Sequence, residues 1–180
     1  MSPIKTLCAD LSAEFVRDPA APRAVSILET YARENDDWRS YAFYSDERYT
    51  RNLIHSDATF ELLIVCWNPD QESPIHNHEG SDCWMTVLDG QVEEQHFDFP
   101  TGNGALKPTR TTTCETATVA FIRDEIALHL VRPIGGKRAA SLHLYSTPIP
   151  SCQIYCPETG QVDRREMSFH SIKGELVGAP

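Results

Sequence analysis

From residue 48 onward, the chain is a series of short strand-like segments separated by turn residues, and this pattern constrains its fold more than any other feature. Strands are expected at 49–54, 60–67, 74–79, 83–88, 91–99, 109–114, 117–122, 126–132, 140–146, 152–155 and 161–167. Turn pairs such as Asp89-Gly90 and Gly135-Gly136 separate them. About ten short strands at regular spacing predict a mainly β fold, either a sandwich or a barrel.

The first 45 residues have a different pattern, which predicts helices. Ile4, Leu7, Leu11 and Phe15 recur at helical spacing after Ser2-Pro3. We expect helices over 3–16 and from about 22 to 32, and a connection or short helix over 36–44. No linker or repeat divides the chain, so the sequence predicts a single domain over 1–180, with a helical part at 1–45 and a barrel at 46–170.

Charge and composition limit the classes of partner. The 180 residues include 16 Lys and Arg against 26 Asp and Glu, a formal net charge of −10. Binders of nucleic acid or anionic membranes need clustered Lys and Arg, so we expect neither partner. The longest apolar run, Leu62 to Trp67, is far shorter than the roughly 20 residues that span a bilayer. With no secretory signal pattern, we expect a cytoplasmic monomer whose six cysteines stay reduced.

His76-Asn77-His78 is the strongest local signal of chemistry. Successive side chains of a strand point to opposite faces, so residues two apart share a face. On the expected strand 74–79, both imidazoles project into the same space and supply half of a divalent metal site. A polar face on an edge strand would give the same pattern, so the metal hypothesis depends on further ligands.

His129 is the expected third ligand. It lies in the apolar run Ile126 to Val131, where a buried histidine needs a partner. Taken alone it could be a hydrogen-bonded core residue; together with His76 and His78 it completes a set of three imidazoles. Such a set suits zinc, and it equally suits Fe(II), so the spacing leaves the metal open.

A third pattern lies on the expected strand 140–146. Ser141, His143 and Tyr145 alternate and therefore share one face. They could form a hydrogen-bonded relay, or hydroxyls packed against a core histidine. The other histidines, His55, His96 and His170, lie in polar or turn contexts and are expected at the surface.

Taken together, these runs resemble the cupins and, within them, the cysteine dioxygenases. The resemblance covers about residues 47–162 and rests on Arg48-Tyr49-Thr50-Arg51-Asn52-Leu53, Cys66-Trp67, the histidine pair followed by Cys83, Leu88-Asp89-Gly90, His96-Phe97-Asp98-Phe99-Pro100, Leu128-His129 and Ser141-Leu142-His143-Leu144-Tyr145-Ser146. It implies a double-stranded β-helix, or jelly-roll, barrel that follows N-terminal helices.

The resemblance also implies an activity and a set of residue roles. The activity is oxidation of L-cysteine by O₂ to cysteine sulfinic acid at a mononuclear Fe(II) centre held by His76, His78 and His129. Cys83 and Tyr145 match a pair joined by a thioether crosslink. The remaining matches are His143 and Ser141 behind that tyrosine, Arg51 for the substrate carboxylate, Tyr49 and Cys152 in the pocket, and Trp67 behind it.

Arg51 is chemically suited to its implied role. A planar guanidinium binds a carboxylate through two parallel, charge-assisted hydrogen bonds, which the point charge of lysine does not match. Three neutral imidazoles also leave the full charge of the metal to attract an anionic thiolate.

Asp82 departs from this pattern and keeps an alternative open. It lies four residues after His78, a spacing at which other cupins carry a carboxylate ligand. Asp82 and Cys83 point to opposite faces of a strand, so only one of them can face inward. Tyr145 is present to meet Cys83, which favours the cysteine.

Other functions compete with L-cysteine oxidation. Oxidation of 3-mercaptopropionate or another small thiol would use the same chemistry, but relatives of that kind look to carry glutamine where this chain has Arg51. A zinc or manganese cupin acting as an isomerase or decarboxylase would use Asp82 as a fourth ligand. A cupin sensor that binds a small ligand would need neither Tyr145 nor Cys83.

Overall fold

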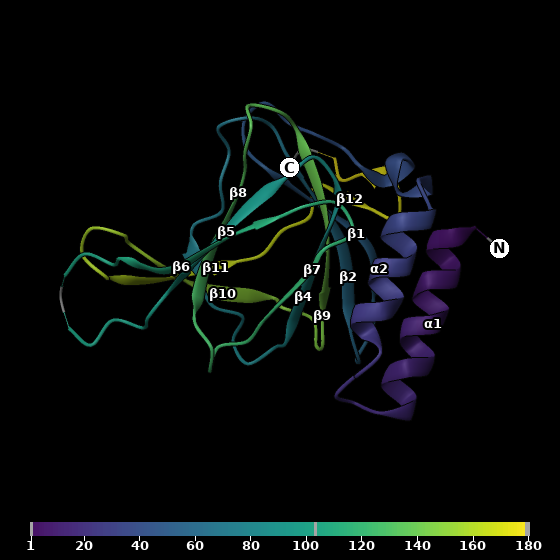
Figure 1. Ribbon diagram of the computed structural model, residues 1–180, viewed down its shortest axis with the longest axis horizontal. Coiled ribbons are helices and arrows are strands. Elements are labelled where there is room, and N and C mark those ends of the chain that lie inside the picture. The colour runs from purple at the N-terminus through teal and green to yellow at the C-terminus, as the bar shows by residue number, and fades with distance from the viewer. Residues whose placement is uncertain (1, 103, 179–180) are drawn as a thin grey trace.

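The computed structural model describes residues 2–102 and 104–178, which form helices at the N-terminus followed by strands in two sheets (Figure 1). The helices are α1 (Pro3–Arg17), α2 (Ala24–Glu34) and a short 3-10 helix (Asp37–Tyr41). The strands are β1 (Thr50–Ser56), β2 (Glu61–Trp67), β3 (Ile75–His76), β4 (Cys83–Asp89), β5 (Val92–Phe97), β6 (Pro108–Cys114), β7 (Val119–Ile122), β8 (Leu128–Pro133), β9 (Ala139–Tyr145), β10 (Ser151–Tyr155), β11 (Val162–Glu166), β12 (Ser171–Ile172) and β13 (Glu175–Leu176).

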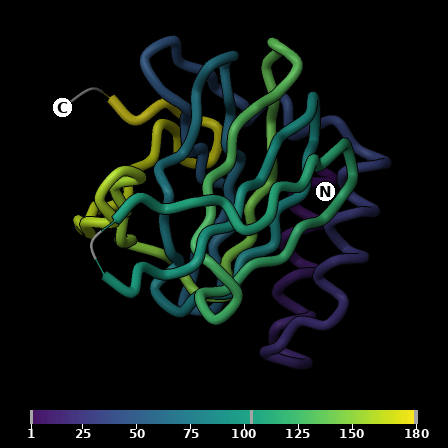
Figure 2. The backbone as a smooth tube through the Cα atoms, turned by 60° about the vertical axis from the view of Figure 1, so that its left-hand side comes forward, coloured from purple at the N-terminus to yellow at the C-terminus, as the bar shows by residue number. Residues whose placement is uncertain are grey.

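The two sheets face each other across a common interior. One has the order β13-β12-β1-β2-β9-β4-β7, and the other has the order β11-β10-β3-β8-β5-β6. The helices pack on the outside of the first sheet, and the second sheet lies on the side away from them (Figure 1). Figure 2, turned by 60°, also keeps the helices on one side of the strands.

Strand β2 illustrates why part of the barrel reads as a continuous apolar run. Leu62 and Ile64 belong to the core beneath the helices, whereas Leu63 and Val65 belong to the core inside the barrel. A strand covered on both faces has no polar side, so its sequence does not alternate. The same alternation decides which side chains of β9 reach the interior.

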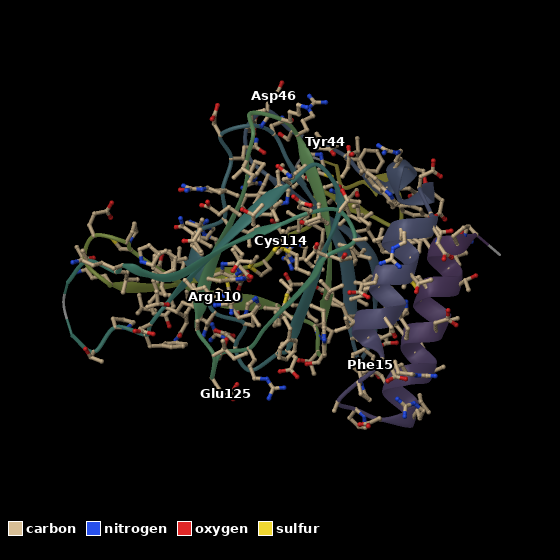
Figure 3. The ribbon with its side chains drawn as sticks, viewed as in Figure 1. Phe15, Tyr44, Asp46, Arg110, Cys114 and Glu125 are labelled. Carbon is tan, nitrogen blue, oxygen red and sulfur yellow. The ribbon has the colours of Figure 1, made fainter. Side chains whose placement is uncertain are left out.

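Phe15 anchors α1 to the first sheet. Its ring lies 5.5 Å from that of Phe60, stacked, and 6.3 Å from that of Trp84, edge-on. Figure 3 labels it on the side of α1 toward the strands. Leu7 and Leu11 are buried on the same helical face, so the spacing that predicts the helix is also what holds it on the barrel.

The secondary structure matches the sequence expectation with local differences. The predicted helices are confirmed, and the segment 36–44 contains a short helix. The expected strand 74–79 is reduced to β3, so His78 lies in the loop that follows. Strands β12 and β13 lie past residue 170, where we expected the barrel to end, and β12 pairs in parallel with β1. The predicted domain limits at 1 and 180 fall outside the described residues.

Two sequence expectations about composition can be compared with the structure. The six cysteines are all free, as expected for reduced thiols. None of the described helices has the length and apolar character required to cross a membrane.

Candidate functional site

His76, His78 and His129 converge inside the barrel. His76 ends β3, His129 lies opposite it on β8, and His78 follows in the next loop. The ligand nitrogens of the three lie within 4.8 Å of one another, and Nε2 of His76 is 3.2 Å from Nε2 of His129. The structure therefore brings together the three imidazoles that the sequence singled out.

The hydrogen bonds around these rings leave nitrogen lone pairs facing one point. Nδ1 of His76 donates to the carbonyl oxygen of Pro74 at 2.9 Å, and Nδ1 of His129 donates to Oε1 of Glu94 at 2.8 Å. Both Nε2 atoms are then unprotonated acceptors. Within the described chain, neither buried ring nitrogen of His78 has a hydrogen-bond partner. In His76 and His129, the Nε2 lone pairs face each other while Nδ1 holds a hydrogen-bond partner outside the cluster, and this is the arrangement of a metal site.

Burial keeps the imidazoles of His76 and His78 neutral. Burial, with a further contribution from nearby His129, lowers the pKa of His76 to about 3. Burial likewise lowers the pKa of His78 well below its ordinary value. Neutral imidazole is the form that binds metals, so the three residues fit a divalent transition metal.

Glu94 and His96 extend this centre, and neither was predicted as part of it. His96, expected at the surface, is buried on β5, with Nε2 3.3 Å from Oε2 of Glu94, so that expectation was wrong. Burial alone would raise the pKa of Glu94, but its contacts with His129 and His96 lower it below its ordinary value. The alternation Val92, Glu94, His96 on one strand was the available signal, because Val92 marks the inward face.

A cavity of about 40 Å³ lies beside the histidines. Its wall includes His76 and His129 together with the predicted residues Tyr49, Arg51, Trp67, His143 and Tyr145. A larger, open groove of about 650 Å³ lies over α1 and α2, but none of its lining residues belongs to the predicted site. The smaller cavity is the candidate substrate site because it adjoins the metal ligands.

A chain of hydrogen bonds runs from Trp67 to Tyr145. The indole Nε1 of Trp67 donates to Oγ of Ser141 at 3.0 Å, and Oγ of Ser141 lies 2.8 Å from Nε2 of His143. Indole can only donate, so the serine hydroxyl accepts from Nε1 of Trp67 and keeps its own proton and a second lone pair for the contact with His143. At the other end of the chain, Nδ1 of His143 lies 3.5 Å from the hydroxyl of Tyr145.

Cys83 and Asp82 take opposite directions, as the strand period requires. Cys83 lies on β4 directly opposite Tyr145 on β9, and its side chain belongs to the core inside the barrel. Burial raises the pKa of the Cys83 thiol well above its ordinary value. The carboxylate of Asp82 binds Arg123 at 2.7 Å, outside the histidine cluster. Asp82 therefore forms an ion pair with Arg123 near the surface.

Arg51 lines the cavity with half of its guanidinium already engaged. Nη2 donates to Oε1 of Glu61 at 3.1 Å, and both side chains are buried. In the described residues Nη1 has no hydrogen-bond partner. Burial raises the pKa of Glu61, whereas the charge of Arg51 opposes that rise.

Two further residues complete the comparison with the sequence prediction. Cys152 is buried, with its Sγ 3.5 Å from Sδ of Met167. Met167, rather than Cys152, is on the cavity wall. The sequence did not single out Met167, since a methionine near the end of a polar strand resembles ordinary core filler.

The sequence matches the family described as cysteine dioxygenase type I over residues 4–157, which is most of the chain. The chain belongs to this family. Among its relatives, cysteine dioxygenase type 1 of Rattus norvegicus is 37% identical over 153 residues, covering 83% of this chain and 76% of the rat protein. The protein of the same name from Danio rerio is 35% identical over 154 residues, covering 83% and 77%.

Solved structures support the fold. A double-stranded β-helix domain protein from Klebsiella pneumoniae has a TM-score of 0.52 at 15% identity, covering 74% of this chain and 98% of its own. Protein TT1209 from Thermus thermophilus has a TM-score of 0.51 at 22% identity, covering 63% and 97%. The predicted mainly β cupin barrel with N-terminal helices is confirmed, and by family the chain is a cysteine dioxygenase, an enzyme.

Proposed function

We propose that this enzyme oxidises L-cysteine with O₂ to cysteine sulfinic acid, and that the metal held by His76, His78 and His129 is Fe(II). The observation that carries the proposal is the position of Arg51 Nη1, a buried cation without a partner among the described residues, on the wall of the cavity that adjoins the three imidazoles. A small thiol with a carboxylate satisfies both groups at once. Bound iron supplies the redox chemistry that lets a thiolate react with O₂.

The overall reaction balances without another reductant. A thiolate RS⁻ and O₂ give RSO₂⁻, so the electrons that sulfur loses are those that O₂ gains, and both oxygen atoms end on sulfur. The protein therefore needs no site for a separate reductant. Its residues bind the carboxylate, hold the sulfur next to the three imidazoles and exclude water.

Arg51 and Tyr49 have binding roles in this proposal. Nη1 of Arg51 donates to the substrate carboxylate, and the ring of Tyr49, stacked on Trp67 at 4.9 Å, forms the adjacent wall. Cys152 supports the cavity from behind Met167. The arginine favours thiols with a carboxylate over those without one.

Tyr145, His143 and Ser141 act through the hydrogen-bond chain. With Nδ1 of His143 donating to it, the phenol of Tyr145 presents its own proton to the cavity, where it can donate to the oxidised sulfur group. Burial raises the pKa of Tyr145, so the phenol keeps that proton. Ser141 fixes the tautomer of His143.

Cys83 and Tyr145 are proposed to form the thioether crosslink. The two residues are direct cross-strand partners, which places their side chains at neighbouring positions on one face. Joining Sγ to the ring removes a hydrogen from each partner and requires an oxidant, which the O₂ and iron of the proposed reaction supply. The crosslink would hold the phenol in place beside the cavity.

We place the enzyme in the cytoplasm as a monomer. Free, buried cysteines are compatible with a reducing compartment, and one chain supplies every residue named on the cavity wall.

The decisive experiment is O₂ uptake by protein loaded anaerobically with Fe(II), with L-cysteine and 3-mercaptopropionate in parallel and sulfinate quantified. We expect uptake with L-cysteine that matches the cysteine sulfinate formed. Preference for 3-mercaptopropionate would overturn the proposed substrate, and no uptake with either thiol despite bound iron would overturn the proposed activity. Manganese and zinc loading under the same conditions test the choice of metal.

A further inference from the structure

His78 is held in place differently from the other two histidines of the cluster. The rings of the other two each have an outer hydrogen-bond partner, which is the carbonyl oxygen of Pro74 in one case and Oε1 of Glu94 in the other. Among the residues that the structure describes, neither ring nitrogen of His78 has such a partner, although the side chain is buried. The position of this imidazole therefore depends on its backbone.

The backbone turns sharply directly after His78. The carbonyl oxygen of His78 accepts from the N–H of Ser81 at 3.1 Å. The two residues between them have positive φ angles, 48° at Glu79 and 88° at Gly80. Glycine adopts such a backbone readily, but a glutamate there brings its Cβ too close to the following carbonyl oxygen. A strained turn of this kind persists only where contacts from the surrounding structure hold it.

Asp124, in the connection between β7 and β8, supplies such contacts. Its Oδ1 accepts from the backbone N–H of His78 at 2.7 Å, and its Oδ2 accepts from that of Gly80 at 2.9 Å. Both bonds are charge-assisted, and the side chain of Asp124 is only 20% exposed, so water competes weakly for them. Nδ1 of the His78 ring is 3.8 Å from Oδ1, too far for a hydrogen bond. Asp124 therefore acts on the backbone of the turn and not on the ring.

A second set of contacts holds the same turn through a side chain. Oε2 of Glu79 accepts from Oγ of Ser151 at 3.1 Å and from Nη2 of Arg164 at 2.8 Å. The side chain of Arg164 is 69% exposed, so water and salt weaken this ion pair. Asp124 is therefore the stronger of the two supports.

We propose that Asp124 is a positioning residue of the metal centre, which holds the turn after His78 and so fixes that imidazole beside the other two. This rests on the proposed function, in which the three histidines hold Fe(II). A ligand that is already in place loses less freedom when the metal binds, so the metal binds more tightly. Without Asp124 the strained turn relaxes, and the imidazole of His78 is no longer fixed.

The test is Fe(II) binding under anaerobic conditions, measured by competition with a chromophoric chelator of known affinity. Asp124→Ala removes both acceptor oxygens. We expect it to raise the dissociation constant of Fe(II) about tenfold or more, as is usual when a residue that orients a metal ligand is lost. Asp124→Asn keeps one acceptor oxygen and gives an intermediate value.

Asp57→Ala is the matched control. Asp57 also holds a turn, between β1 and β2, by accepting from two backbone N–H groups, those of Thr59 at 2.7 Å and Phe60 at 3.1 Å. It belongs neither to the histidine cluster nor to the cavity wall. We expect Asp57→Ala to lower the melting temperature of the metal-free protein, as Asp124→Ala does, but to leave the dissociation constant of Fe(II) unchanged. Equal effects of the two alanine variants on Fe(II) binding, or no effect of either, would overturn the proposal.

His78→Ala distinguishes failure of this inference from failure of the proposed function. If His78→Ala weakens Fe(II) binding while both Asp124 variants bind Fe(II) as the wild type does, His78 is a ligand and Asp124 only stabilises the turn. If His78→Ala itself binds Fe(II) with wild-type affinity, the three-histidine site is wrong. Should Asp124→Ala not fold, Asp124→Asn decides alone, and a wild-type dissociation constant in that variant overturns the proposal.

Discussion

At the scale of single residues, Arg51 yields the most direct prediction about the proposed substrate. Arg51→Ala removes the cation that meets the carboxylate, so KM for L-cysteine rises about tenfold or more, since a hydrogen bond to a charged group contributes about 1.5–3 kcal/mol. Iron content stays unchanged because Arg51 does not belong to the cluster of three histidines that could hold the metal. Steady-state kinetics and metal analysis on the same preparation check both statements.

Arg51→Lys is the matched control, because alanine leaves Glu61 buried without its partner. Lysine keeps a positive charge beside Glu61 and so preserves folding, but it offers a point charge in place of a directed N–H. Its KM lies between those of the wild type and Arg51→Ala. Wild-type KM values in both variants would contradict a role in substrate binding.

The crosslink gives a second residue-scale prediction. Wild-type protein isolated after turnover has a mass below that of its sequence by the two hydrogens lost in joining Cys83 to Tyr145. Tyr145→Phe removes the hydroxyl that activates the ring, so its intact mass equals that of the sequence. Peptide mapping should recover the two segments joined only in the wild type. An unlinked wild type after many turnovers with L-cysteine would argue against the crosslink.

Residue-scale reasoning from the sequence found the ligand cluster but missed its charged neighbours. His76 and His78 stand out because two histidines on one face are rare in an apolar context. Glu94 and Glu61 also lie on interior faces, but the sequence prediction did not single them out. The missed signal was the same in both cases: a charge at an inward position requires a partner across the barrel.

At the scale of elements, the histidine pair shows a limit of the rule that residues two apart on a strand share a face. Strand β3 ends at His76, so His78 reaches the centre from a loop and not from a strand face. The loop is held by Asp124, whose carboxylate accepts from the backbone N–H of His78 at 2.7 Å and of Gly80 at 2.9 Å. This contact joins segments far apart in the sequence, so no local pattern could reveal it.

Short elements were unpredictable for a related reason. Strands β12 and β13 have two residues each, too few for any period. They form because Ser171 Oγ donates to Oδ1 of buried Asn52 at 2.8 Å and because β12 pairs with β1. By contrast, β2, β4 and β9 are long and buried on both sides, and their apolar runs were sufficient to predict them.

The docking of α1 is an element-scale prediction about stability. Phe15→Ala removes the ring that packs between α1 and the sheet, and it lowers the free energy of unfolding by about 3–5 kcal/mol. Val16→Ala, at the next position, changes it by less than about 0.5 kcal/mol, because Val16 is 87% exposed. Urea unfolding measures both values. Similar losses in the two variants would mean that α1 is not held by this face.

At the scale of the whole molecule, the site depends on both sheets at once. Arg51 and Tyr145 come from the helix-covered sheet, whereas His76 and His129 come from the other. The helices pack on the outer face of the first sheet, so they support the cavity without lining it. The residues proposed to bind the substrate and those proposed to bind the metal therefore lie on opposite walls, and the relative position of the two sheets sets the distance between them.

The buried neutral histidines make the stability of the metal-free protein depend on pH. Burial lowers the pKa of His143 and of His76 to about 3 each, from 6.5. The unfolded chain therefore binds protons that the folded chain does not, and the stability present above pH 6.5 is lost as the pH falls toward 3. Each such histidine contributes a slope of about 1.4 kcal/mol per pH unit within that window.

His143→Gln tests this linkage, because glutamine does not titrate. In chelator-treated protein, the free energy of unfolding plotted against pH between about 6 and 4 becomes shallower by about 1.4 kcal/mol per pH unit than in the wild type. Loss of the hydrogen bond with Ser141 lowers the whole curve but does not alter its slope. His55→Gln, outside the cavity wall, serves as the control. An unchanged slope in His143→Gln would mean that His143 is already protonated in the folded protein over this pH range, which would contradict the lowering of its pKa by burial.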